Sequence, residues 1–166
     1  MNNRIGDNLI HLGANEKLVR TLSQTGVKFI VVGGLAVAWY CPDRQADDLD
    51  LLVEPTSENS ERIARALMTL QLGKFSPESF AKPGLQVPLK HIFYAELLTP
   101  QQDAPAFSEI EAGATDAKLF NIPVRLASVS ALIEMKKRAV ELATEQQMKH
   151  LKDIALLEKH YTYADN

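Results

Sequence analysis

The sequence predicts an α+β fold (mixed α/β), in which helices pack against a small mixed β-sheet and a helical segment ends the chain. Residues 27–32 and 49–53 are short apolar runs of the kind found in buried strands. Amphipathic helical patterns precede and follow these two runs. From residue 128 onward, apolar residues recur at helical spacing. The order of these patterns indicates a sheet first and helices last.

Length and composition are those of an ordinary globular protein. The chain has 166 residues, of which 46% are hydrophobic and 23% are charged. We therefore expect one domain over residues 1–166, with a core at about 15–126 and C-terminal helices at about 128–160.

Charge and cysteine content exclude several classes of site. The net charge of −3 argues against a general polyanion-binding surface. The single cysteine, Cys41, excludes an internal disulfide and a multi-cysteine zinc site. No apolar run approaches the roughly 20 residues of a membrane span, and no signal peptide is visible. We expect a cytoplasmic protein with no membrane contact.

The first predicted elements are a helix, a strand and a second helix. Asn15 resembles an N-cap before Leu18, Val19 and Leu22, and Gly26 is a helix stop. The strand at 27–32 ends at paired glycines, and a short helix at 35–40 follows them.

The second strand, 49–53, leads into a helix that has several candidate caps. Thr56, Ser57 and Asn59 are capping residues, and Gly73 closes the helix. Its predicted apolar face consists of Ile63, Ala66, Leu67 and Leu70.

The later elements follow from turn signals and periodicity. We expect loops with one weak strand at 74–88, a strand at 90–99, a surface loop at 100–114 and a hairpin at 118–126 that turns near Asn121 and Ile122. The strand at 90–99 carries Glu96 in an otherwise apolar row. The predicted apolar stripes of the C-terminal helices are Leu132, Ile133, Met135, Ala139 and Leu142, then Met148, Leu151, Ile154, Ala155 and Glu158, with fraying after His160.

Two aspartates near the second strand are candidate metal ligands. Asp48 and Asp50 are two residues apart, which places both side chains on one side of an extended chain. Carboxylate oxygens suit Mg²⁺ in phosphoryl transfer. Two other interpretations remain open: acidic residues in the first turn of a helix, or solvated charges at a strand edge. An EF-hand is excluded because its further ligands and glycine are missing.

The paired glycines, Gly33 and Gly34, suggest a phosphate cradle. Glycine lets a backbone approach an anion closely, and the next helix directs its N-terminus there. The other interpretation is a tight turn without a ligand. Neither a G-x-G-x-x-G fingerprint nor a P-loop is present.

Taken together, residues 31–36 and 44–53 resemble the signature of the minimal nucleotidyltransferases of the DNA polymerase β superfamily. That signature is a hydrophobic residue with Gly-Gly or Gly-Ser, a short helix, and Arg-x-Thr-x-Asp-hydrophobic-Asp before an apolar strand. Residues 95–99 resemble the strand of the third carboxylate, 128–136 the stretch before a family lysine, and 152–154 the Lys-Asp pair that follows. This version of the signature is similar to that of bacterial toxin–antitoxin and abortive-infection nucleotidyltransferases.

The resemblance implies transfer of a nucleoside monophosphate from an NTP to an acceptor hydroxyl, by two-metal catalysis. The acceptor would be a tRNA end, a protein or a small molecule. The implied ligands of two Mg²⁺ ions are Asp48, Asp50 and Glu96, which are also the catalytic residues. The implied nucleotide-binding residues are Gly33, Gly34, Arg44 and Lys136. Arg44 is equally suited to a salt bridge with Asp47 or Asp50.

Two positions depart from the family pattern. Ala46 stands where threonine is usual, and Glu96 is one methylene longer than the usual aspartate. The alternative function is therefore a catalytically weakened binding or regulatory module of the same fold, for example a toxin–antitoxin component that acts through a partner protein. The remaining histidines, His11, His91, His150 and His160, share no metal-site spacing and are interpreted as surface or structural residues.

Overall fold

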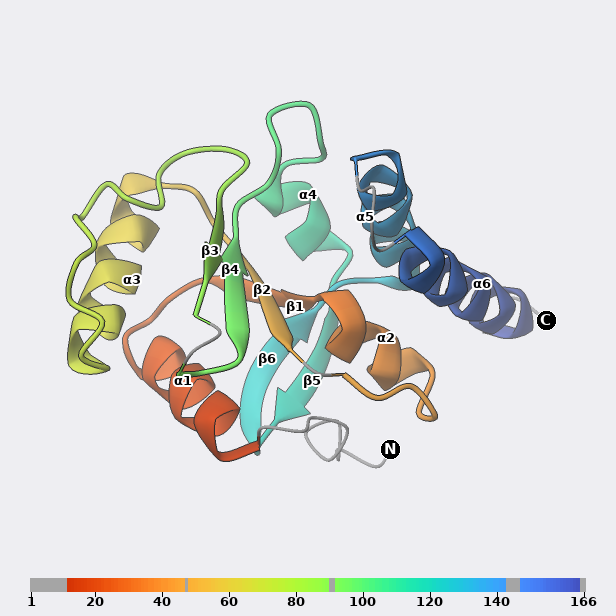
Figure 1. The fold of residues 1–166 in the computed structure, drawn as a ribbon, viewed down its shortest axis with the longest axis horizontal. Helices are drawn as coiled ribbons and strands as arrows, with labels where there is room; N and C mark the ends of the chain where they lie inside the picture. Colours follow the sequence, from red (N-terminus) through yellow and green to blue (C-terminus); the bar gives the residue numbers. More distant parts are fainter. Residues whose placement is uncertain (1–11, 47, 90–91, 143–146, 165–166) are drawn as a thin grey trace.

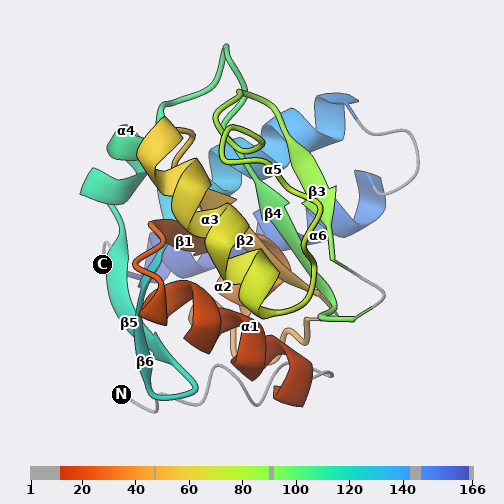
Figure 2. The same ribbon diagram turned by 90° about the vertical axis from the view of Figure 1, so that its left-hand side faces the viewer.

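The computed structural model describes residues 12–46, 48–89, 92–142 and 147–164. These residues form a mixed β-sheet with the strand order β3-β4-β2-β1-β6-β5 and helices on both faces (Figures 1 and 2), which confirms the predicted fold class. The strands are β1 (Phe29–Val32), β2 (Leu49–Val53), β3 (Gln86–Pro88), β4 (Ala95–Leu98), β5 (Thr115–Leu119) and β6 (Ile122–Leu126). The helices are α1 (Leu12–Gln24), α2 (Gly33–Tyr40), α3 (Ser57–Thr69), α4 (Phe107–Ala112), α5 (Val129–Leu142) and α6 (Gln147–Ala164).

Strand directions bring three strand ends together. β1 runs antiparallel to β2, and β2 runs parallel to β4, so the last residue of β1 meets the starts of β2 and β4. In this register Val32 lies beside Asp50, and Asp50 lies beside Glu96. We call this edge of the sheet the glycine end, because Gly33 directly follows Val32.

Two groups of helices enclose the sheet (Figure 1). α1 and α3 contact each other on one side, and α2, α5 and α6 contact one another on the other side. The strands between them are apolar; all four residues of β1 are buried. Fully buried large side chains come from every layer: Leu18, Leu22, Ile30, Leu35, Leu49, Leu51, Ile63, Leu67, Phe80, Leu97, Leu119 and Leu126.

Several predicted elements are confirmed with their local chemistry. β2 has the predicted bounds, and the Thr56 side chain caps α3 by accepting a hydrogen bond from the Asn59 amide. The predicted apolar face of α3 is buried. The hairpin turns at Phe120 and Asn121, whose φ angles of 55° and 62° suit a two-residue turn.

Asn15 has a different position from the predicted N-cap. α1 begins at Leu12, so Asn15 lies inside the helix, where it is fully buried. Its side-chain amide donates to the carbonyls of Phe93 and Tyr94. The asparagine that looked like an N-cap in the sequence therefore makes tertiary hydrogen bonds and does not cap the helix. The predicted helix stop is confirmed, since Gly26 has φ 77° just after α1.

Three elements in the middle of the chain differ from those predicted from the sequence. The predicted strand at 90–99 is shorter, because the chain turns through residues 92–94 before β4; His91 lies outside the described residues. The predicted loop at 100–114 contains α4, which buries Phe107 and Ile110. After α3, the left-handed residue is Gln71, with φ 64°, so the helix is closed before Gly73.

The predicted apolar stripe of α6 is wrong except at Ile154, which is buried. Met148 and Leu151 are 70% and 48% exposed, whereas Asp153 and Leu157 are buried. The buried carboxylate of Asp153 has cationic partners in the interior, and this pairing determines which face of α6 points inward. α6 also continues past His160 to Ala164. Neither α6 nor any other described helix combines the length and apolar character needed to cross a bilayer.

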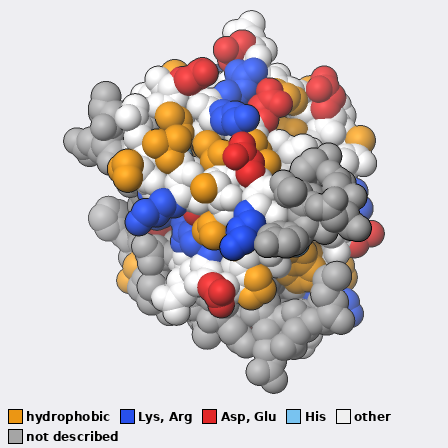
Figure 3. Space-filling view, turned by 90° about the vertical axis from the view of Figure 1, so that its right-hand side faces the viewer, with side chains coloured by type: hydrophobic (Ala, Val, Ile, Leu, Met, Phe, Trp, Pro, Cys, Tyr) orange, Lys and Arg blue, Asp and Glu red, His pale blue; other side chains and the backbone are white. Residues whose placement is uncertain are grey.

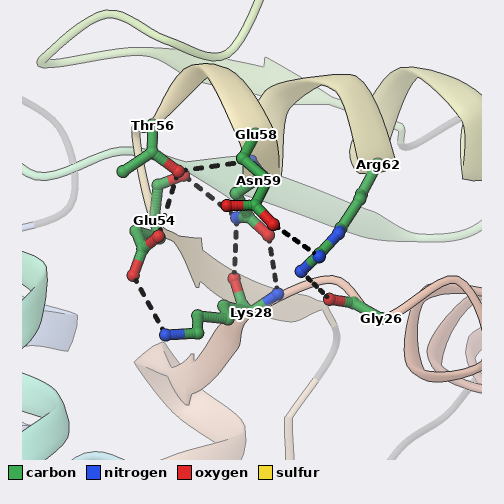
Figure 4. Close-up of polar contacts among 7 residues, drawn as sticks. All are labelled: Gly26, Lys28, Glu54, Thr56, Glu58, Asn59 and Arg62. Atoms are coloured by element: carbon green, nitrogen blue, oxygen red, sulfur yellow. Dashed lines mark hydrogen bonds and ion pairs between the residues drawn. The ribbon is translucent and has the colours of Figure 1, made fainter.

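The edge of the sheet opposite the glycine end is closed by a polar network, shown in Figure 4. The Lys28 amide donates to the Asn59 side chain, which donates in turn to the carbonyls of Lys28 and Glu54. These contacts join the chain before β1 to the chain after β2. We call this edge the Asn59 end.

Candidate functional site

The glycine turn and Asp50 are in direct contact. Gly33 has φ 69°, a conformation that favours glycine. A Cβ placed on Gly33 would overlap the Asp50 carboxylate and lie 2.9 Å from the Cβ and Cγ of Asp50. Gly33 is therefore required both by its backbone angle and by the approach of the predicted metal ligand.

The predicted carboxylates come from the starts of two neighbouring strands. Asp50 and Glu96 are register partners in parallel strands, so their half-buried side chains project from the same face of the sheet. Asp48 lies in the bend before β2. Across the described ranges, no three Asp, Glu, His or Cys side chains lie close enough together to hold a metal ion. The three predicted metal ligands, Asp48, Asp50 and Glu96, are thus close along the backbone, but their side chains do not converge on one point.

Gly34 lies against Arg44. A Cβ placed on Gly34 would be 3.0 Å from Nη2 of Arg44. The guanidinium donates from Nε to Oδ1 of Asp153 at 2.9 Å and from Nη2 to Oδ2 at 3.3 Å. The ion pair found for Arg44 is thus with Asp153 on α6; Asp47, one of the partners considered from sequence, lies outside the described residues.

Lys136 reaches the same carboxylate from α5. Its Nζ lies 3.1 Å from Oδ2 of Asp153, and the two residues are 8% and 1% exposed. Burial opposes ionisation of Asp153, but the hydrogen bond from Arg44 and the positive charge of Lys136 outweigh it. The pKa of Asp153 is consequently below its ordinary value. Arg44, Lys136 and Asp153 form a buried ion triad.

His150 extends this triad along α6. Its Nδ1 lies 3.4 Å from Nζ of Lys136. Burial and the Lys136 charge lower the pKa of His150, so the imidazole is neutral at pH 7. On the other side of the triad, burial and the Asp153 charge raise the pKa of Cys41, which keeps its thiol protonated at neutral pH.

The structure therefore brings the predicted residues together in two groups that meet at the glycine turn. Asp50 and Glu96 lie on the Gly33 side, and Arg44 and Lys136 lie on the Gly34 side. Sequence reasoning noted a Lys-Asp pair at 152–154 but did not include Asp153 in the site. The sequence signal that could have identified Asp153 is its spacing from Leu157, which lies four residues later and therefore on the same face of α6. Both residues are buried, and a buried aspartate almost always has a charged or hydrogen-bonding partner.

A cavity of about 870 Å³ lies farther along the face of the sheet that carries Asp50 and Glu96. Leu52 and Leu98 line it, and each is two residues after Asp50 or Glu96 on the same strand. The cavity therefore opens on the carboxylate-bearing face, roughly 7 Å along the strands. Other walls come from α4, α5 and the chain after β4, while His150 connects the cavity to the ion triad. The predicted site residues themselves do not line it.

The face formed by α5 and α6 has mixed charge (Figure 3). Basic side chains cross the middle of this view, and acidic side chains lie above and below them. Both helices expose both signs of charge: α5 exposes Glu134, Lys137 and Glu141, and α6 exposes Lys149, Lys152, Glu158 and Lys159. This face is not a continuous basic surface of the kind that binds long nucleic acids.

The sequence matches no protein-family model and no curated protein sequence. Solved structures match the fold. An antigenic nucleotidyltransferase-like protein from Paracoccidioides brasiliensis is 14% identical, with a TM-score of 0.55 over 87% of this chain and 74% of that chain. ANT(2″)-Ia in complex with adenylyl-2″-tobramycin is 17% identical, with a TM-score of 0.55 over 89% and 90%. The solution structure of the antibiotic-resistance factor ANT(2″)-Ia is also 17% identical, with the same TM-score over 87% and 80%. The chain therefore has the nucleotidyltransferase fold.

Proposed function

We propose that the protein transfers a nucleoside monophosphate from an NTP to an acceptor hydroxyl. The observation that supports this proposal most directly is the contact between Asp50 and the glycine turn. Glu96 lies next to Asp50 in the strand register, and the fold is shared with nucleotidyltransferases. A carboxylate packed on a glycine turn next to a second carboxylate combines a metal ligand with a backbone that a phosphate can approach.

Asp48, Asp50 and Glu96 are the proposed ligands of two Mg²⁺ ions. Their chemistry fits, because hard carboxylate oxygens are what Mg²⁺ prefers, and Gly33 leaves room for the Asp50 carboxylate at the turn. When bound, Mg²⁺ would neutralise the charge that develops on the transferred and leaving phosphates. Because the three carboxylates do not converge on one point in this structure, metal binding requires their side chains to rotate toward each other.

Arg44 and Lys136 are the proposed partners of the β- and γ-phosphates. Both cations form ion pairs with Asp153, and its negative charge offsets the repulsion between them in the protein interior. Bidentate geometry suits Arg44 for a phosphate, whereas Lys136 acts as a point charge. Phosphate oxygens would then share these two cations with Asp153.

The proposed chemical step is an in-line displacement. The acceptor oxygen forms a bond to the α-phosphorus, and the bond from that phosphorus to the bridging oxygen of the β-phosphate breaks. Pyrophosphate leaves with the bonding electron pair, and Glu96 accepts the proton of the acceptor hydroxyl. The products are the nucleotidylated acceptor and pyrophosphate.

The proposed acceptor site is the 870 Å³ cavity. Its volume lies within the range of small-molecule sites, and its wall residue Leu98 is two residues after Glu96 on the same face of the sheet. ANT(2″)-Ia, which shares the fold, has a structure with adenylyl-2″-tobramycin. A small molecule, a tRNA end and a protein side chain remain the acceptor classes to test.

The test is release of pyrophosphate from labelled NTPs in the presence of Mg²⁺ and candidate acceptors. We expect Asp48→Asn and Asp50→Asn each to abolish release without unfolding the protein. Glu54→Gln is the control, because Glu54 lies at the far end of β2. Full activity in both aspartate variants would refute the mechanism.

A second candidate is a nucleotidyltransferase-fold module that works without turnover, such as a toxin–antitoxin component acting through a partner protein. The engagement of both candidate phosphate ligands by Asp153 favours it, as does buried Ala46 in the place of a hydroxyl. Isothermal titration with NTPs and Mg²⁺ separates the two functions. Absence of binding for every NTP supports the module, and nucleotide incorporation supports the enzyme.

A further inference from the structure

Asn15 is a buried polar residue that contacts the turn leading into β4, which is far from it in sequence. It is fully buried in α1. Its Nδ2 donates to the carbonyls of Phe93 and Tyr94, 78 and 79 residues away. Oδ1 of Asn15 has no hydrogen-bond partner within the described part of the chain. The side chain thus acts through its amide donor alone.

The acceptor Tyr94 is held in an unusual conformation. Its φ is 50°, in the left-handed region that side-chain-bearing residues rarely adopt. The same turn is fixed by bonds from the Phe93 amide to the Leu89 carbonyl at 2.9 Å and from the Leu89 amide to the Ala95 carbonyl at 2.7 Å. Backbone strain of this kind persists only where surrounding contacts impose it.

The Tyr94 carbonyl also accepts a hydrogen bond from the Leu49 amide at 3.0 Å. Leu49 is flanked by Asp48 and Asp50 in the chain, and Tyr94 is two residues before Glu96. One carbonyl therefore connects α1, the start of β2 and the start of β4. Figures 1 and 2 show the turn that leads into β4 next to α1.

We propose that Asn15 is a positioning residue that holds the Tyr94 turn and thereby aligns Asp48 and Asp50 with Glu96 for divalent metal binding. This inference rests on the proposed function, because it concerns the same carboxylates. The inference goes beyond the proposed function because it makes the relative position of these carboxylates depend on the Asn15 side-chain amide in α1.

Comparison with Asn59 separates positioning from simple stabilisation. Asn59 is also buried, at 2% exposure, and both its amide oxygen and its amide nitrogen are bonded to backbone. Asn15 leaves one buried polar atom without a partner, which disfavours folding. An apolar side chain would serve packing better at that place, so the amide donor is retained for the turn that it holds.

The experiment compares Asn15→Ala, the isosteric Asn15→Asp and the control Asn59→Ala in the full chain. Asn15→Asp keeps the shape and removes the amide donor, so it remains informative if Asn15→Ala fails to fold. Two quantities are measured at a temperature where the variants are folded by circular dichroism. They are the Mg²⁺ concentration for half-maximal pyrophosphate release, and the affinity for Mn²⁺ from the loss of its free electron paramagnetic resonance signal.

We expect the Asn15 variants to raise the half-maximal Mg²⁺ concentration and the Mn²⁺ dissociation constant at least tenfold. Asn59→Ala should change both by less than twofold while losing a similar amount of stability. Equal shifts in all variants, or no shift in the Asn15 variants, would overturn the inference. If the wild type binds Mn²⁺ but releases no pyrophosphate, the proposed function fails and the Mn²⁺ affinities alone decide the role of Asn15. A wild type that binds no Mn²⁺ overturns the role as well.

Discussion

The two ends of β2 use polar groups in opposite ways. At the Asn59 end, one buried asparagine bonds three backbone groups, and Lys28 pairs with Glu54 at 3.6 Å (Figure 4). At the glycine end, two carboxylates stand side by side, Asp50 packs on a glycine, and two cations share one buried carboxylate. β2 therefore begins beside buried, concentrated charge and ends where a neutral amide side chain bonds the backbone.

This difference separates a folding role from a binding role. The polar groups of Asn59 are matched within the chain, so they contribute to the fold and offer nothing to a ligand. Adjacent carboxylates and buried cations are costly to gather, and such groups are typical of sites that bind ions or phosphates. Variants at the glycine end should therefore change activity together with stability, whereas variants at the Asn59 end should change stability alone.

The largest expected effect is that of Asp153→Asn. Removing this carboxylate leaves Arg44 and Lys136 as neighbouring buried cations, which should cost about 3 kcal/mol of unfolding free energy. Urea unfolding measures the cost, and pyrophosphate release should fall as well. Asp116→Asn is the control, since Asp116 is 86% exposed in its pair with Arg125 and should cost well under about 1 kcal/mol. Equal costs would show that Arg44, Lys136 and Asp153 do not form a buried ion triad in the folded protein.

Gly33→Ala should cost about 2 kcal/mol and most of the activity. The added Cβ would strain a backbone with φ 69° and displace the Asp50 carboxylate. Gly73→Ala is the matched control, because its Cβ would meet nothing within 4 Å. Thermal unfolding and pyrophosphate release should separate the two variants; a fully active Gly33→Ala protein would contradict the close packing described above.

Asn59→Ala should also cost about 2 kcal/mol, because the Lys28 amide and the Glu54 carbonyl lose their side-chain partner, whereas the Lys28 carbonyl keeps the Glu54 amide at 3.3 Å. Its turnover number should stay unchanged under conditions where the protein is folded. Urea unfolding and steady-state kinetics test the two statements. A loss of turnover as large as that of Gly33→Ala would mean that the ends of the sheet are not independent.

The smallest expected effect concerns acid pH. The pKa of Asp153 is lower in the folded chain than its ordinary value of 3.8, so its ionisation stabilises the fold above that value. The stability difference between the wild type and Asp153→Asn should be constant from pH 7 to about 5. It should shrink as the pH falls through the folded pKa. Urea unfolding at several pH values tests this; a difference that grows on acidification would contradict the direction of the shift.

Where local chemistry decides structure, sequence reasoning succeeded. The bounds of β2 and the Thr56 cap of α3 follow from an apolar run and a capping hydroxyl. The predicted hairpin is also present, and its turn lies at Phe120 and Asn121, one residue before the predicted position. Most of the α6 stripe was wrong, although Ile154 is buried, because the inward face includes Asp153, whose partners lie on other elements. Asn15 failed as a cap for the same reason, since its partners are the carbonyls of Phe93 and Tyr94.

The sequence by itself determined the α+β class, the glycine turn before α2 and the carboxylates at the start of β2, because each depends on residues close together in the chain. Tertiary structure alone decided that Glu96 lies beside Asp50 and that Arg44, Lys136 and Asp153 form one triad. These contacts join residues on different elements, and strand register and helix packing choose such pairs. The glycine turn is where the two kinds of information meet: Gly33 and Gly34 are evident in the sequence, but the side chains that require them are visible only in the fold.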